Sequence, residues 1–405
     1  MLKRYFLNNK KRNFSTASIW IKGGSDMDST GKKGINKILC SLLTRGCEGF
    51  NNFTLSEYIE SYGAELNQEI FEDGISISIK SLNEHFSKLF PLLDLIINKP
   101  ILSETEFKKV KKSSIDHIKK DKENPFNICF EKWRKIVYSN HPYAFNTIGY
   151  ANNVSKITYE DVLLEFKNLK NREKYLISNN PEINGENFGT LEKKILKEKS
   201  DPLNHNLNTT NRFDYINNDS NQTIIMMGDQ TCSRRSSEYF PLKVLESYLS
   251  YGMSAALFKL FREKHGITYD LGVYYPIRSG NAPFLIYLSV SNEQALFAFE
   301  LLSTLWKNLL LNPLTDAEIF LAKEKLKGSF LLGNQSLDEI LQRKIQLVSY
   351  GISPISENDL NSKIEEISSL DILKLTNKYF SKPFLSISGN KNICLEISNR
   401  WKKNF

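Results

Sequence analysis

The sequence predicts an α+β protein of two homologous domains, each an antiparallel β-sheet with helices packed on one face. Two observations support this fold class. Segments typical of strands and segments typical of helices come in runs, without the regular strand–helix alternation that builds a parallel sheet. The order of these segments also repeats at an offset of about 210 residues, which indicates duplication of a whole domain and not of a short solenoid unit.

Length, composition and charge agree with this organisation and exclude several classes of protein. The 405 residues are enough for two or three domains. With 40% hydrophobic and 25% charged residues the composition is that of an ordinary globular chain. The sequence contains no run of about 18 apolar residues, so no membrane span is predicted. The net charge of +8 is modest, and no basic patch with interleaved aromatic residues predicts nucleic-acid binding.

The first copy of the repeat begins with residues 75–81 (ISISIKS), which alternate between apolar and polar side chains as a half-buried strand does. An amphipathic helix follows, and then a long charged helix that runs to about Lys120. Ser103 and Glu106 have the spacing of a capping box at its start. Residues 284–330 repeat the same order of strand, apolar helix and second long helix.

Matching residues in the two copies strengthen the case for duplication. The matches are Asn83-Glu84 with Asn292-Glu293, Leu102-x-Glu104-x-Glu106 with Leu314-x-Asp316-x-Glu318, and ITYEDVLLEF at 157–166 with ISSLDILKLT at 367–376. Between the copies lies a stretch rich in Asn, Asp, Ser and Lys, which is typical of a linker. We therefore expect a first domain at 1–182, a linker at 183–222 and a second domain at 223–405.

The five cysteines and the amino terminus bear on the compartment. The cysteine count is odd and no pair has CxxC spacing, which favours reduced thiols over a disulfide framework. The amino terminus is basic but lacks the apolar core of a signal peptide, and strand-like sequence begins by about Arg4. We therefore expect a cytoplasmic protein, from a bacterium, with an organelle matrix as the alternative.

Residues 34–46 (GINKILCSLLTRG) predict a helix with an apolar stripe, and Lys37, Cys40 and Ser41 share the neighbouring face. In this frame the sequence resembles the pitrilysin, insulysin and mitochondrial processing peptidase family. Members of that family carry His-x-x-Glu-His at these three positions, where the two His bind zinc and the Glu is the general base.

Further segments extend this resemblance over nearly the whole chain except the linker. They are DHIKKDKENP at 116–125, where the family has its third zinc ligand, HPYAFNTIGYANNVSKITYEDV at 141–162, and GMSAALFKLFREKHGITYD at 252–270. The resemblance implies the duplicated fold derived above, in a subunit that forms half of a clamshell.

The chain departs from the family at each chemically essential position. Lys37 and Ser41 replace the two His, Cys40 replaces the general base, His117 replaces the third-ligand Glu, and Val110 replaces an acidic residue seven positions earlier. A catalytic zinc needs about three protein ligands. Cys40 and His117 supply at most two, beside a positive charge, so we expect no zinc and no other cofactor in this chain. A nucleophile–base pair of Cys40 and His117 is an alternative, but a small apolar side chain in the helix is the expected role of Cys40.

The second half retains Arg262 and, seven residues later, Tyr269, with Gly266 placed to end the helix between them. In the family, an Arg and a Tyr with this spacing grip the substrate near the scissile carbonyl. The resemblance therefore implies that Arg262 binds the peptide and that the Tyr269 hydroxyl donates to the developing oxyanion. From the residues alone, an Arg that caps its helix and a Tyr packed on a sheet explain the pattern as well.

A lost zinc motif beside a retained Arg262/Tyr269 pair predicts the non-zinc-binding subunit of a zinc metallopeptidase. We expect it to be inert alone and to cleave peptides as a heterodimer with a zinc-bearing homologous subunit, although a homodimer stays open. Residues 65–79 (ELNQEIFEDGISISI) are a candidate strand for peptide addition, or else an internal strand. Two other functions stay open: a structural or assembly subunit, resembling the family's core proteins in respiratory complexes, and a peptide-capture or regulatory module without turnover.

Overall fold

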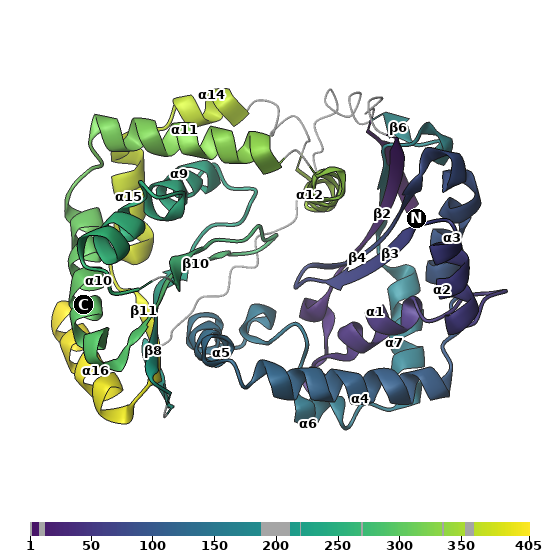
Figure 1. The fold of residues 1–405 in the computed structure, drawn as a ribbon, viewed down its shortest axis with the longest axis horizontal. Coiled ribbons are helices and arrows are strands. Elements are labelled where there is room, and N and C mark those ends of the chain that lie inside the picture. The colour runs from purple at the N-terminus through teal and green to yellow at the C-terminus, as the bar shows by residue number, and fades with distance from the viewer. Residues whose placement is uncertain are drawn as a thin grey trace. The chain divides into compact units, whose positions relative to one another are not determined.

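The computed structural model describes residues 2–7, 13–187, 211–218, 220–268, 270–333, 336–352 and 360–405. They form two compact units, each built on one β-sheet (Figure 1). Most of the expected linker at 183–222 lies outside the described residues, as does Tyr269. The boundaries expected at 182 and 223 therefore stay a prediction.

The sheet of the first unit has the strand order β3-β4-β2-β5-β1-β6. Its strands are β1 (Leu2–Phe6), β2 (Phe14–Lys22), β3 (Glu65–Ile70), β4 (Gly74–Leu82), β5 (Lys174–Ser178) and β6 (Glu186–Asn187). The pairs β3/β4, β4/β2 and β2/β5 are antiparallel, whereas β1 runs parallel to β5 and β6. Strand β3 ends the order, so it pairs with a described strand along one edge only.

Helices cover one face of this sheet and enclose the core of the first unit. They are α1 (Ile35–Leu43), α2 (Asn52–Ser61), α3 (Phe86–Asn98), α4 (Glu104–Asp121), α6 (Ala151–Val154) and α7 (Tyr159–Asn171), with short 3₁₀ turns between them. Ile19 of β2 lies opposite Ile77 of β4, and both are buried in this core. The alternation that predicted a strand at 75–81 is therefore the alternation of core-facing side chains.

The sheet of the second unit has the order β7-β11-β8-β10-β9. Its strands are β7 (Phe213–Asn217), β8 (Gln222–Gln230), β9 (Asp270–Tyr274), β10 (Pro283–Ser291) and β11 (Phe384–Gly389). Its helices are α9 (Tyr239–Ser250), η5 (Phe258–Lys264), α10 (Ala295–Leu311), α11 (Asp316–Gly333), α14 (Leu360–Glu365), α15 (Ser369–Phe380) and α16 (Lys391–Asn404). Only the β7/β11 pair is parallel among the described strands of this sheet.

The predicted fold class, α+β with two homologous domains, is confirmed. The order β4–α3–α4 recurs as β10–α10–α11, and α7–β5 recurs as α15–β11. Helices α7 and α15 also begin with equivalent capping boxes, Thr158 with Asp161 and Ser368 with Asp371. The sheets differ from the prediction in being mixed, since each has parallel pairing toward one edge.

One helix is exchanged between the two halves of the sequence. Helix α5 (Pro125–Tyr138) belongs to the second unit, where it packs on β7, β8 and β11. Helix α12 (Leu337–Ser349) holds the equivalent place in the repeat and packs on β2 and β5 in the first unit. There Trp20, Tyr175 and Leu341 form a separate buried cluster. Each sheet thus has helices on both faces, an arrangement that the sequence analysis did not predict.

Among the described residues, no helix combines the length and the apolar character needed to cross a lipid bilayer.

Candidate functional site

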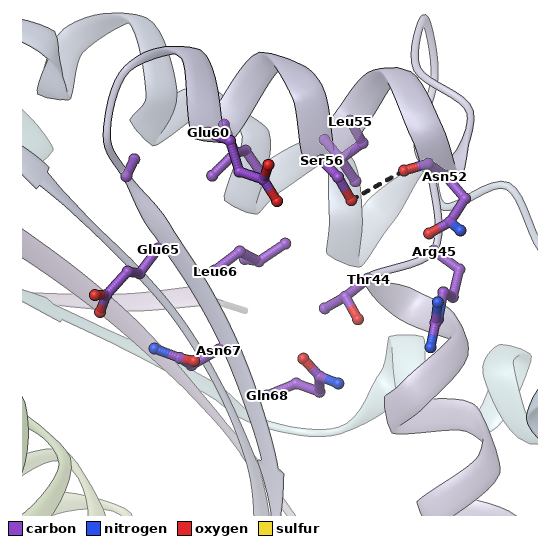
Figure 2. Close-up of a pocket in the computed structure, with 12 residues that line it drawn as sticks. Thr44, Arg45, Asn52, Leu55, Ser56, Glu60, Glu65, Leu66, Asn67 and Gln68 are labelled. Carbon is purple, nitrogen blue, oxygen red and sulfur yellow. Dashed lines mark hydrogen bonds between the residues drawn. The ribbon is translucent and has the colours of Figure 1, made fainter. Parts of the chain in front are cut away.

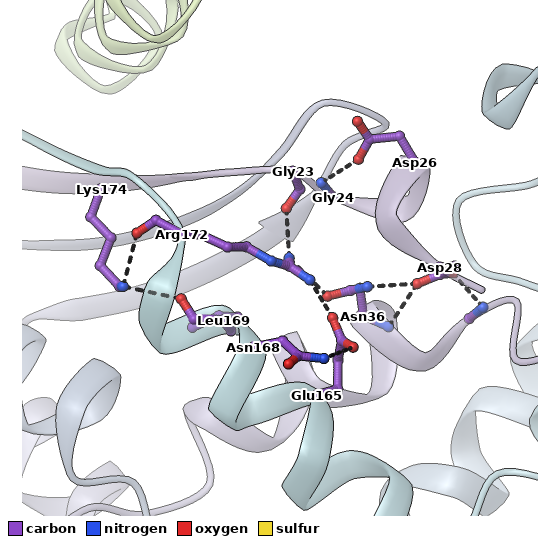
Figure 3. A network of polar contacts seen from close by, with 11 residues as sticks. Gly23, Gly24, Asp26, Asp28, Asn36, Glu165, Asn168, Leu169, Arg172 and Lys174 are labelled. Carbon is purple, nitrogen blue, oxygen red and sulfur yellow. Dashed lines mark hydrogen bonds and ion pairs between the residues drawn. The ribbon is translucent and has the colours of Figure 1, made fainter. Parts of the chain in front are cut away.

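The first turn of α1 is fixed by a buried carboxylate, Asp28. One Asp28 oxygen, Oδ2, accepts a hydrogen bond from the backbone N–H of Gly34 at 2.6 Å. The other, Oδ1, accepts from the backbone N–H of Asn36 at 3.1 Å and from its Nδ2 at 2.7 Å (Figure 3). Burial raises the pKa of the Asp28 carboxyl, and these hydrogen bonds oppose the rise. The negative charge at the start of a helix also complements its dipole.

Arg172, just after α7, ties this turn to the rest of the first unit. Its Nη1 donates to the carbonyl of Gly23 at 2.9 Å and to Asn36 Oδ1 at 3.0 Å, and its Nη2 forms an ion pair with Glu165 (Figure 3). The Arg172 and Glu165 side chains are 9% and 13% exposed. The helix that carries the degenerate motif is therefore held at a set position against α7 and the end of β2.

Asp26, beside this network, is expected to make stability depend on pH. Burial, and then the charge of Asp73, raise the pKa of Asp26 to about 7. The pKa of an aspartate in the unfolded chain is about 4. Protonated Asp26 therefore stabilises the folded state fully below pH ~4, and this stabilisation is lost as the pH rises through 7. An Asp26→Asn variant keeps an acceptor for the Gly24 N–H. We expect it to be more stable than the wild type at pH 8, by on the order of 1–3 kcal/mol, with a smaller difference at pH 5.

Thermal unfolding of the Asp26→Asn variant at pH 5 and pH 8 checks this expectation. The matched control is Asp116→Asn, which changes an exposed carboxyl on α4. A gain in melting temperature of Asp26→Asn that is the same at both pH values contradicts it.

The structure brings three of the four degenerate zinc-motif positions together. Lys37 and Ser41 from α1 and His117 from α4 line one open cavity of about 480 Å³. Val110, which the resemblance matches to an acidic residue that is not a zinc ligand, lines the cavity as well. The three positions that the resemblance matches to zinc ligands of the family therefore line one cavity.

Cys40 does not line this cavity. Its side chain is fully buried in the core of the first unit. Burial raises the pKa of the Cys40 thiol to about 12, against the opposing charge of Lys37. A protonated thiol is neither a ready nucleophile nor a ready metal ligand. The arrangement thus favours the role of a small apolar core residue for Cys40 over a pairing with His117, which is exposed on α4.

The side chains in the cavity do not fit a zinc ion. His117 is the one imidazole at the ligand positions, the Ser41 hydroxyl is a weak neutral ligand, and Lys37 brings a cation. A catalytic zinc takes three N, O or S ligands from the protein. Within the described parts of the chain, no three His, Cys, Asp or Glu side chains gather in a way that could hold a metal ion.

A second cavity, of about 470 Å³, lies beside the first. Its lining comes from the end of α1, from α2 and from β3 (Figure 2). Arg45 and Asn52 line both cavities. The second cavity therefore leads from the degenerate motif to β3, the strand that ends the sheet order.

Arg45 is a site residue that the sequence analysis missed. It lies eight residues after Lys37, and Ser41 lies between them at the i+4 position. A continued helical period places all three on one side, so this periodicity was the signal that could have identified Arg45, although α1 itself ends at Leu43.

Arg262 lies in η5, a segment with wide π-helical turns that the sequence did not predict. Its side chain is exposed, and its guanidinium carbon lies 4.7 Å from the centre of the Phe258 ring. The segment ends at Lys264, and Gly266, two residues later, has a φ of +63°, the left-handed value expected just after a helix. Tyr269 lies outside the described residues, so the pairing of Arg262 with Tyr269 stays a prediction.

Comparison with known proteins gives the same family for both halves of the chain. Residues 4–150 match the sequence model of the insulinase family, peptidase family M16, and residues 182–326 match that of the peptidase M16 inactive domain. An uncharacterized zinc protease of Rickettsia felis is 23% identical over 89% of this chain and 88% of its own length. An uncharacterized zinc protease of Bacillus subtilis is 22% identical over 96% and 99%.

Solved structures show the same fold. The crystal structure of a peptidase M16 inactive domain from Pseudomonas fluorescens superposes with a TM-score of 0.83, at 19% identity, covering 96% of this chain and 95% of that one. The crystal structure of a protease from Helicobacter pylori gives a TM-score of 0.82 at 16% identity, covering 95% and 96%.

Proposed function

The chain belongs to the M16 family of peptidases, and we propose that it is a subunit that does not bind zinc and that pairs with a zinc-bearing homologue to cleave peptides. The observation that carries the proposal is the set of side chains that line the cavity between α1 and α4, called the motif cavity below. Lys37, Ser41 and His117, which the resemblance matches to zinc ligands of the family, line this cavity, and Cys40 is buried outside it. A cytoplasmic location is part of the proposal.

In this role the chain's own residues bind and position the peptide. An extended peptide pairs by backbone hydrogen bonds with the edge of β3 that no described strand occupies, which is a common mode of peptide recognition. Arg262 keeps a permanent charge at the surface of the second unit, where its fixed donors hold a peptide carbonyl. Tyr269 donates to the oxyanion. Activation of water is supplied by the zinc-bearing partner.

A reconstituted peptidase assay tests this function. The purified chain is mixed with a homologue that has an intact His-x-x-Glu-His motif, and cleavage of fluorogenic peptides is measured. We expect this chain alone to be inactive and the mixture to be active and sensitive to chelators. Arg262→Ala is expected to lower kcat/KM at least about tenfold, since it removes a charged hydrogen bond to the substrate.

The control for Arg262→Ala is Lys264→Ala, which removes another exposed charge from η5. Equal loss in the two variants, wild-type activity of Arg262→Ala, or no cleavage by the mixture contradicts the proposal.

A peptide-capture protein without turnover is the second candidate, and the edge position of β3 favours it. Such a protein binds peptides alone and adds no hydrolysis to the mixture. A structural or assembly role is distinguished by the same assay, because neither Arg262→Ala nor Tyr269→Phe then changes the partner's activity.

A further inference from the structure

We propose that the cavity between α1 and α4 binds a carboxylate group of a peptide. The cavity is the one lined by Lys37, Ser41 and His117. This inference deepens the proposed function by naming acidic peptides as the ligands, but it is tested on this chain alone.

The charges that line the cavity are unbalanced. Lys37 and Arg45 both line it, and neither side chain has a hydrogen bond or ion pair within the described residues. The only carboxylate among the lining side chains, Glu106, is already paired with Lys109 at 2.7 Å. Two cations without a counter-charge in one concave site attract an anion.

The neutral side chains around these cations are also suited to an oxygen-rich ligand. Ser41 projects from α1, Ser113 and Ser114 from α4, and Asn52 from the start of α2. The described residues provide no hydrogen-bond partner for these four side chains. The planar guanidinium of Arg45 matches the two oxygens of a carboxylate, and charge-assisted bonds of this kind are the strong ones.

The connection to β3 favours a peptide as the source of the carboxylate. Arg45 and Asn52 line both this cavity and the one that follows β3. A peptide that extends the sheet at β3 therefore passes within reach of Arg45, and the motif cavity is then open to one of its side chains or to its carboxyl terminus. A volume of about 480 Å³ is large enough for such a group.

Calorimetric titration of the isolated chain with two matched peptides tests the inference. Both are acetylated, amidated, alanine-rich heptapeptides, one with a central glutamate and the other with glutamine. We expect the glutamate peptide to bind at least about tenfold more tightly at low salt. We expect this preference to weaken at 0.5 M salt, because salt screens partly exposed charges.

Substitutions test whether the preference for the glutamate peptide arises in this cavity. Lys37→Gln and Arg45→Gln are each expected to reduce the preference for glutamate severalfold. Lys112→Gln removes an exposed lysine of α4 that does not line the cavity, and it is expected to leave the preference unchanged. Circular dichroism of each variant confirms folding. Inorganic phosphate is titrated in competition with the glutamate peptide, which tests whether the cavity binds a free oxyanion instead.

The inference is overturned if the two peptides bind equally or not at all, or if Lys112→Gln reduces the preference as much as Lys37→Gln. It is also overturned if phosphate binds but the glutamate peptide does not displace it, because the ligand is then a free anion. None of these outcomes bears on coupled hydrolysis with the zinc-bearing partner, so a failure here is distinguishable from a failure of the proposed function.

Discussion

Replacement of Gly149 by alanine is expected to lower the free energy of unfolding by at least about 3 kcal/mol, or to prevent folding. Gly149 has a φ of +80°, and a Cβ atom there would lie 2.3 Å from the carbonyl oxygen of Lys33 and 2.6 Å from Gly34 Cα. Both neighbours are backbone atoms in the turn that starts α1. They cannot move without displacing the helix that lines the motif cavity.

The matched control for Gly149→Ala is Gly49→Ala. Gly49 has a similar φ of +86°, but a Cβ atom there meets nothing within 4 Å. The control therefore carries the backbone cost alone, about 1–2 kcal/mol. Urea denaturation of both variants, followed by circular dichroism, measures the difference. Equal destabilisation would show that the close packing of Gly149 against residues 33 and 34 contributes nothing.

Much of the fold could be predicted from the sequence because its signals are local. The alternation at 75–81 gave β4, and the spacing of Ser103 and Glu106 gave the start of α4, where the Ser103 hydroxyl accepts from the Glu106 N–H at 3.2 Å. The repeat gave the two homologous sheets. Periodicity shows that a helix has a buried face, but not which sheet covers that face. The exchange of α5 and α12 was therefore not predictable by this reasoning.

Local sequence patterns also predicted only part of the candidate site. The resemblance to the family singled out Lys37, Ser41 and His117, and the structure brings them to one cavity. The contacts that hold α1 join residues far apart in the sequence, such as Arg172 with Gly23, and no local pattern marks them. Arg45 was missed because only the positions of the zinc motif were considered on this helix, although its spacing from Lys37 matched the helical period.

Replacement of Arg172 by leucine is expected to cost about 3–5 kcal/mol, because it leaves the largely buried carboxylate of Glu165 unpaired. The carbonyl of Gly23 and Asn36 Oδ1 lose a donor in the same step. The double variant Arg172→Leu/Glu165→Leu is expected to be less destabilised than Arg172→Leu alone, since no unpaired charge then remains in the interior.

The control for Arg172→Leu is Arg400→Leu in α16. Arg400 pairs with Glu396 at 2.6 Å and also with Glu300, but the three side chains are 36%, 50% and 52% exposed. Exposed pairs contribute about 0–1 kcal/mol, so this variant is expected to unfold almost as the wild type does. If urea denaturation finds equal losses for the two arginines, burial of the Arg172–Glu165 pair does not account for its contribution to the free energy of unfolding.

If the double variant is no more stable than Arg172→Leu, the lost hydrogen bonds to Gly23 and Asn36 dominate the cost. In that case Arg172 stabilises the start of α1 through its donors and not by neutralising Glu165.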